Sequence, residues 1–196
     1  KNAKQKQKIS SAALKDENLI VVAVDNAPNE VVYPQMADFT FYGGLYRDVN
    51  IIAVEESHFD LENFGGPGIK VTPEVEGNNA SVTIEAPVVG AKNGQTLVYI
   101  ITDKEGNVVG CCDGEVSEGK TVIELTNVTL WHGRKNPYLY TAEVKLVEDG
   151  KEVDVVKTRF GCRTFKIDPD NGFILNGEEY PLRGVSRHQD RPDIGN

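Results

Sequence analysis

Short runs of apolar and β-branched residues, separated by polar turns, recur through the middle of the chain. In residues 80–86 the apolar side chains occupy every second position, as expected of a strand with one buried face. Comparable strand-like runs cover residues 69–75, 80–86, 96–102, 108–112, 121–125, 138–147 and 153–160. Gly, Asn and Asp are concentrated between these runs, and no segment has the period of a helix. The central part of the chain is therefore predicted to be all-β.

The spacing of these runs indicates how the strands are arranged. About seven short strands in about 100 residues, with a turn between successive strands, are typical of an Ig-like β-sandwich. A Gly- and Pro-rich stretch at residues 63–68 marks the boundary before the sandwich. We predict two further strands before it, at residues 19–25 and 45–54.

The C-terminal part predicts a hairpin. Asn176 and Gly177 lie between two short apolar runs, and this pair favours a two-residue turn in which both residues have positive φ. We expect residues 180–185 to form the second arm, and residues 166–171 to be a polar link that precedes the hairpin. A charged loop then follows the second arm.

Composition narrows the class of protein. Hydrophobic content of 39% and charged content of 26% are ordinary for a globular domain. A net charge of −9 argues against nucleic acid as a partner, because binding phosphates requires a basic surface. No apolar run approaches the ~20 residues of a membrane span.

The three cysteines, Cys111, Cys112 and Cys162, form no metal-site pattern. Free thiols in a reducing compartment are favoured over a disulfide bond from Cys162 to Cys111 or Cys112.

Three segments resemble glycoside hydrolase family 2, and the bacterial β-galactosidases in particular. Residues 33–49 contain Gly-Gly-Leu-Tyr-Arg-Asp-Val, and residues 131–140 combine a Trp, an Asn-Pro pair and Tyr-Leu-Tyr. Residues 172–190 contain the hairpin and end in Gly-Val-Ser-Arg-His-Gln-Asp. The resemblance implies three parts: residues 1–66 as the C-terminal part of a jelly-roll sugar-binding domain, 67–165 as the Ig-like sandwich, and 166–196 as the truncated start of a catalytic TIM barrel.

The resemblance also implies the chemistry. The family hydrolyses glycosides with retention through two Glu residues, and in the members that this chain resembles both would follow residue 196. We therefore expect no catalytic residue in this chain, and an inactive fragment of an enzyme for terminal β-D-galactosides. Asp38 would bind Na⁺ and the C6 hydroxyl of the sugar, and His188 would bind ring hydroxyls; Mg²⁺ is a further cofactor of the parent enzyme.

The residues by themselves allow simpler interpretations. An Asp in an aromatic loop is most often a turn-former, and a lone His at a strand end is by default a surface residue. His58 and His132 are both expected at the surface, and a sugar-stacking role for Trp131 is the less favoured alternative.

Two other functions stay open: a carbohydrate-binding module, and an Ig-like interaction domain without catalysis. Unpaired strand edges would allow a homo-oligomer to form by strand exchange. We expect a cytoplasmic location, with a periplasmic or secreted protein as the alternatives.

Overall fold

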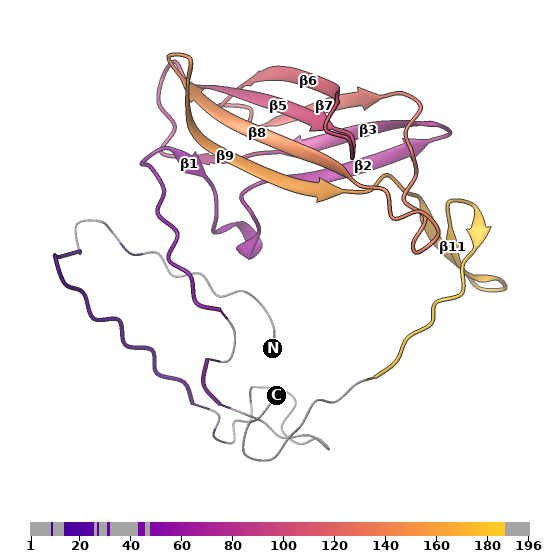
Figure 1. Ribbon diagram of the computed structural model, residues 1–196, viewed down its shortest axis with the longest axis horizontal. Coiled ribbons are helices and arrows are strands. Elements are labelled where there is room, and N and C mark those ends of the chain that lie inside the picture. Colours follow the sequence, from indigo (N-terminus) through magenta and orange to yellow (C-terminus); the bar gives the residue numbers. More distant parts are fainter. Residues whose placement is uncertain are drawn as a thin grey trace. The chain divides into compact units, whose positions relative to one another are not determined.

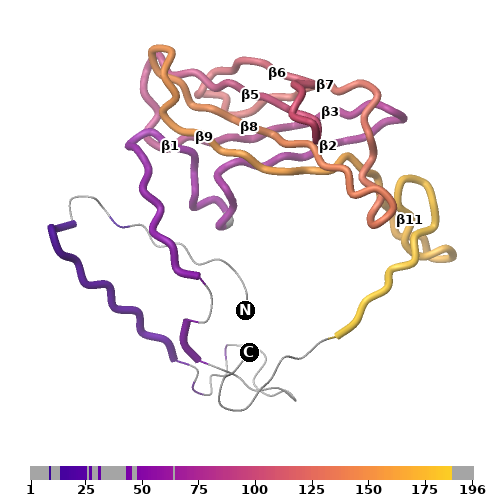
Figure 2. Tube along the Cα trace, in the orientation of Figure 1, coloured from indigo at the N-terminus to yellow at the C-terminus, as the bar shows by residue number. Residues whose placement is uncertain are grey.

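The computed structural model describes residues 9, 14–25, 27, 31, 43–45 and 48–186 (Figures 1 and 2). Contacts group Ala53–Leu182 into one compact unit. The remaining described residues belong to a second unit, which is considered by itself below. Domain boundaries at residues 66 and 166 stay predictions.

Two antiparallel sheets form the body of the first unit and lie face to face (Figure 1). The three-stranded sheet has the order β2-β3-β7, and the four-stranded sheet has the order β6-β5-β8-β9. Their bounds are β2 Lys70–Glu76, β3 Asn79–Glu85, β7 Lys120–Leu125, β5 Thr96–Thr102, β6 Val108–Glu115, β8 Tyr140–Glu148 and β9 Lys151–Phe160. Each of the seven predicted central strands is present, so the prediction of an all-β, Ig-like sandwich is confirmed.

The core lies between the two sheets. Along β3, β5 and β8 every second side chain is buried, so the period-2 pattern of the sequence becomes an inner and an outer face. Leu97, Tyr99 and Ile101 of β5 are fully buried opposite the three-stranded sheet, together with Val144 and Leu146 of β8. Burial of each large aliphatic side chain contributes about 1.5–3 kcal/mol to stability.

A small two-stranded sheet closes one end of the sandwich. β1 (His58–Phe59) pairs with β4 (Val88–Val89), and a single 3-10 turn, η2 (Asn63–Gly65), follows β1. The Phe59 side chain is fully buried in the main core, and its backbone N–H donates to Asp154 Oδ2 at 2.9 Å. The packed unit therefore includes residues that precede the Gly- and Pro-rich stretch.

A third sheet forms at the C-terminal end of the unit from β10 (Phe165–Asp168), β11 (Gly172–Leu175) and β12 (Glu178–Glu179). Asn176 and Gly177 connect β11 to β12 with φ of 51° and 82°, which confirms the predicted two-residue hairpin. The predicted second arm over residues 180–185 is wrong: β12 immediately follows the turn, and residues 180–186 form no strand.

The prediction of a polar link over residues 166–171 is wrong in its first half, where β10 pairs with β11. Asp168 explains why the chain reverses its direction after β10. Its Oδ1 accepts backbone N–H groups of Asp170 and Asn171, at 3.1 and 3.0 Å, and so turns the chain back onto β11.

The strands predicted at residues 19–25 and 45–54 are wrong for the residues that the structure describes. These segments contain no strand, and Leu19, Val21 and Ile51 are 90%, 80% and 84% exposed. Strand propensity is local, but a strand also requires a neighbour that accepts and donates its backbone hydrogen bonds. Neither segment has such a neighbour among the described residues.

All three cysteines are free thiols, so the alternative of a disulfide from Cys162 is wrong. Cys162 is fully buried in the core, and this desolvation raises the pKa of its thiol to about 11. Cys111 is exposed on β6. In the described part of the chain, no helix has the length and apolarity needed to cross a membrane.

Candidate functional site

The two substrate-binding residues predicted from the sequence, Asp38 and His188, lie outside the described residues, so their roles stay predictions. The sodium site predicted at Asp38 also lies outside them. Within the described ranges, no group of three His, Cys, Asp or Glu side chains could hold a metal ion. The chain that leads towards His188 is described up to Ser186.

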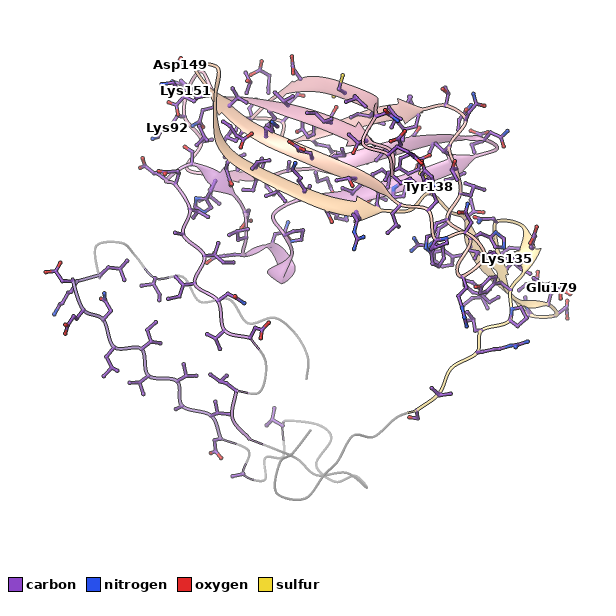
Figure 3. The ribbon with its side chains drawn as sticks, in the orientation of Figure 1. Lys92, Lys135, Tyr138, Asp149, Lys151 and Glu179 are labelled. Carbon is purple, nitrogen blue, oxygen red and sulfur yellow. The ribbon has the colours of Figure 1, made fainter. Side chains whose placement is uncertain are left out.

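Before that segment, several polar residues form a contact between the sandwich and the C-terminal hairpin. We call this contact the hairpin junction and define it by His132 and Lys135 of one sandwich loop and Asn176, Glu178 and Tyr180 of the hairpin. Figure 3 labels Lys135 on the loop side and Glu179 on the hairpin side. All these residues belong to the same compact unit.

The loop side of the junction is a tight turn. The His132 backbone N–H donates to the Asn136 carbonyl at 2.7 Å, and the Asn136 side-chain amide donates to the Leu130 carbonyl at 3.1 Å. Gly133 has φ of 55° in this turn, and a Cβ there would overlap the Tyr180 hydroxyl. Glycine is therefore required both by the backbone conformation and by the closeness of the hairpin.

Asn176 connects three segments through its side chain. Its Nδ2 donates to the Trp131 carbonyl at 2.9 Å, while its Oδ1 accepts the Thr164 backbone N–H at 2.9 Å. The Asn176 backbone N–H also donates to the Thr164 carbonyl at 2.9 Å. One residue thus forms the hairpin turn and attaches the turn to the sandwich.

These backbone partners also determine the tautomer of His132. A carbonyl can only accept and an N–H can only donate, so the Asn176 amide has one orientation. Its Nδ2 lies 3.2 Å from His132 Nδ1, which must act as the acceptor. In the neutral ring, the proton is therefore on Nε2.

His132 Nε2 faces Glu178 Oε2 at 3.4 Å. The neutral ring assigned above makes no ion pair with this carboxylate, and Nε2 has no hydrogen-bond partner in the described chain. Lys135 Nζ approaches the same carboxylate oxygen at 3.3 Å. The Glu178 side chain is mostly exposed, so its pairing with Lys135 contributes less than about 1 kcal/mol.

Tyr180 completes the junction. Its hydroxyl oxygen accepts the Arg134 backbone N–H at 3.3 Å, and its ring meets the His132 ring edge-on at 5.8 Å between centroids. The prediction that His132 is a surface residue is wrong, because its side chain is only 16% exposed. A lone His in a loop carries no local sign of such packing, since the partners lie more than 40 residues further along the chain.

The neighbouring Trp131 packs against other parts of the same unit. The Arg163 guanidinium lies over its ring at 5.2 Å from the centroid. A Cβ at Gly161 would lie 2.8 Å from the Trp131 Cβ, so the backbone packs closely against this side chain. Trp131 has a packing role in this structure.

The hairpin junction has the chemistry of a docking contact. Glu178 and Glu179 are consecutive residues of one strand, and consecutive side chains point to opposite faces. They therefore cannot form the facing pair of carboxylates that glycoside hydrolysis requires. The junction instead attaches the hairpin to the sandwich.

Comparisons with known proteins relate the sandwich to a family. Residues 67–163 match the model of the glycosyl hydrolases family 2. The chain is 31% identical over 190 residues to a β-glucuronidase of Bacteroides fragilis, covering 92% of this chain and 27% of that protein. It is also 31% identical over 190 residues to a β-galactosidase of Thermoanaerobacter pseudethanolicus, covering 91% of this chain and 24% of that protein.

A solved structure has the same fold. The FMN-binding β-glucuronidase from Facaelibacterium prausnitzii L2-6 superposes with a TM-score of 0.77 and 41% identity, covering 84% of this chain and 26% of that chain. The present chain therefore spans about a quarter of the length of the relatives that it matches. The sandwich observed here, with its match to the family model over residues 67–163, shows that this chain carries a domain of the glycosyl hydrolases family 2.

Proposed function

We propose that this chain is part of a family 2 glycosidase that hydrolyses terminal β-linked sugars with retention of configuration. The observation that carries the proposal is the match to relatives named β-glucuronidase and β-galactosidase, which extends over about nine-tenths of the chain. The similarity thus continues on both sides of residues 67–163, the part that matches the family model. A carbohydrate-binding module or an Ig-like interaction domain without catalysis is not favoured, because the relatives bear the names of enzymes.

Two substrate classes are supported by different observations. The residue pattern around Asp38 resembles β-galactosidases, and it favours a terminal β-D-galactoside. The names of the Bacteroides and Facaelibacterium proteins favour a β-D-glucuronide as the second candidate. The two sugars differ at C6, which carries a neutral hydroxyl in galactose and a carboxylate in glucuronic acid. An Asp beside C6 suits the hydroxyl, because a second carboxylate there would be repelled.

In this proposal the present chain contributes binding rather than catalysis. Retaining glycosidases place two carboxylates about 5–5.5 Å apart, one as acid/base and one as nucleophile. His188 would bind ring hydroxyls, and Asp38 would bind the C6 hydroxyl and Na⁺. The 196-residue chain by itself is therefore expected to be inactive.

The test uses the complete enzyme and the 196-residue chain in parallel, each purified from a host without β-galactosidase or β-glucuronidase. We expect the complete enzyme to cleave p-nitrophenyl β-D-galactoside faster than the matching glucuronide, and the chain alone to cleave neither. Faster cleavage of the glucuronide would replace the first substrate class by the second. Cleavage of neither sugar by the complete enzyme, or turnover by the purified chain, would contradict the proposal.

A second measurement tests the proposed binding residues. In the complete enzyme, His188→Ala should lower kcat/KM by about 10²-fold or more if His188 holds the sugar in the transition state. His58→Ala is the matched control, because His58 Nδ1 lies 2.8 Å from the Glu55 carbonyl of its own segment. Equal activities of the two variants would remove His188 from the site.

A further inference from the structure

The chain contains three Asn-Gly pairs, and the structure places them in three different environments. Asn93 is exposed in the turn before β5, and its side chain makes no hydrogen bond among the described residues. Asn171 is exposed, with its Nδ2 3.1 Å from Asp168 Oδ1. Asn176 is half-buried, and both atoms of its amide have backbone partners. The asparagine side chain of the same dipeptide thus has no, one or two hydrogen-bonded atoms, depending on its place in the molecule.

Asn-Gly pairs have a specific chemical weakness. The backbone nitrogen of the glycine can attack the side-chain carbon Cγ of the preceding asparagine, because no Cβ on the glycine obstructs the approach. A C–N bond forms, the Cγ–Nδ2 bond breaks, and the amide leaves as ammonia with the backbone proton. Water then opens the resulting succinimide to aspartate or isoaspartate. The net change consumes one water and releases one ammonia, with no change of oxidation state.

The hairpin junction opposes this reaction at Asn176. The attacked carbon lies between an oxygen held by the Thr164 N–H and a nitrogen held by the Trp131 carbonyl, each at 2.9 Å. Moving Cγ towards the Gly177 nitrogen requires both hydrogen bonds to break. Ring closure should therefore occur only from molecules in which the hairpin has separated from the loop, and its rate follows the population of that open state.

We propose that Asn176 is a conformation-dependent deamidation site, which the docked hairpin protects and which, once converted, prevents the hairpin from docking again. After conversion to aspartate, an oxygen can still accept the Thr164 N–H. The donor to the Trp131 carbonyl is lost, and a carboxylate oxygen then faces that carbonyl oxygen. His132 Nδ1 loses its donor as well. Because the amide cannot re-form without a nitrogen source, the loss of the contact is permanent.

This inference is independent of the proposed glycosidase activity, since it concerns only contacts within Ala53–Leu182. In the sequence, the hairpin directly precedes the segment that contains His188.

The experiment follows the three sites by mass spectrometry in the purified 196-residue chain, incubated at mildly alkaline pH. Tryptic peptides separate Asn93 from the other two sites, and fragment ions distinguish Asn171 from Asn176. We expect Asn176 to convert at least about tenfold more slowly than Asn93 in the folded protein, and at a similar rate in denaturant. Conversion of Asn176 as fast as Asn93 in the folded protein would overturn the proposal.

A variant tests the link to the junction. Tyr180→Ala removes the side chain that contacts His132 and the Arg134 N–H, and Tyr180 does not belong to the hydrophobic core cluster. It should raise the rate at Asn176 towards that at Asn93 while leaving the Asn93 rate unchanged. Gly133→Ala, which places a Cβ against the Tyr180 hydroxyl, should act in the same direction. An unchanged rate at Asn176 in both variants would also overturn the proposal.

The consequence of conversion is tested by Asn176→Asp, with Asn93→Asp as its matched control. The first variant should lose hydrogen-exchange protection at the Arg134 N–H, which donates to the Tyr180 hydroxyl across the hairpin junction. The control should keep it. Full protection in Asn176→Asp would show that the hairpin stays docked after conversion and would contradict the second half of the proposal.

Discussion

The sandwich and the hairpin junction are adjacent in one compact unit but are held together by different physical forces. The sandwich buries a continuous layer of side chains from β3, β5 and β8, most of them fully excluded from water. The junction depends on a few directional hydrogen bonds around Asn176 and Tyr180, at a surface that stays half-exposed. Area burial is strong and non-directional, whereas each hydrogen bond contributes only about 0.5–1.5 kcal/mol. We therefore expect the junction to open locally without unfolding the sandwich.

The largest expected effect is a change in the sandwich core. Leu146 of β8 is fully buried, and Leu146→Ala should lower the free energy of unfolding by about 2–5 kcal/mol, because it leaves a cavity between the sheets. Leu182→Ala is the control, since Leu182 is 70% exposed and should change stability by less than about 0.5 kcal/mol. Denaturant unfolding followed by fluorescence measures both. Similar losses in the two variants would contradict the comparison.

Loss of the hydroxyl should affect stability differently at two buried tyrosines. The Tyr140 hydroxyl accepts the Thr129 N–H at 2.8 Å, so Tyr140→Phe should cost about 1–2 kcal/mol by leaving that donor unpaired. The Tyr99 hydroxyl has no hydrogen-bond partner in the described chain, and burial raises its pKa to about 12. Tyr99→Phe should therefore be neutral or stabilise by up to about 1 kcal/mol. Destabilisation by Tyr99→Phe would indicate a partner for that hydroxyl.

At the junction, Asn176→Gly should keep the hairpin turn but remove the side chain that attaches the turn to the sandwich. Glycine tolerates the φ of 51° but has no side chain to bind Trp131 and Thr164. Amide exchange should show protection of the hairpin reduced by about 1–2 kcal/mol, with protection of β5 and β8 unchanged. Asn93→Gly serves as the control and should change neither. Equal loss throughout the unit would mean that hairpin and sandwich unfold together.

The smallest expected effect is an electrostatic one on the outer face of the sandwich. The Lys157 ammonium, 2.7 Å from Glu143, lowers the pKa of this carboxyl below its usual value near 4.5, and Lys145 adds to the effect. Because the folded pKa is the lower one, this stabilisation is present above about pH 4.5 and is lost as pH falls through the folded value. Glu143→Gln should cost less than about 1 kcal/mol at pH 7, and this cost should decrease as pH falls below about 4.5. A cost that does not change with pH would exclude the ion pairs as its cause.

The seven central strands could be predicted because strand periodicity is a local property. In β3 the alternation of Ala80, Val82 and Ile84 with more polar neighbours is sufficient to predict both the strand and its buried face. The Asn176-Gly177 turn was predictable for a similar reason, since positive φ at both positions depends on residue type. The prediction of strands at residues 19–25 and 45–54 was wrong, because strand propensity alone does not supply a neighbouring strand to pair with.

The candidate site was less predictable. The roles of Asp38 and His188 were predicted only from the resemblance to a family, and both residues lie outside those that the structure describes. The contacts of Asn176 with Trp131 and His132 have no local signature, because they join residues more than 40 positions apart. A signal was present in Gly133, because glycine is favoured where a tight turn requires positive φ. The sequence does not show that Tyr180 occupies the space beside it.

The sequence by itself thus determined the all-β class, the seven sandwich strands and the hairpin turn, since each depends on residue type and on spacing between near neighbours. Only the tertiary structure decided that β10 pairs with β11 and that His132 is enclosed. It alone shows that Asn176 attaches the hairpin to the sandwich. These features depend on which distant segments meet, and a buried donor or acceptor must find its partner wherever the fold places one.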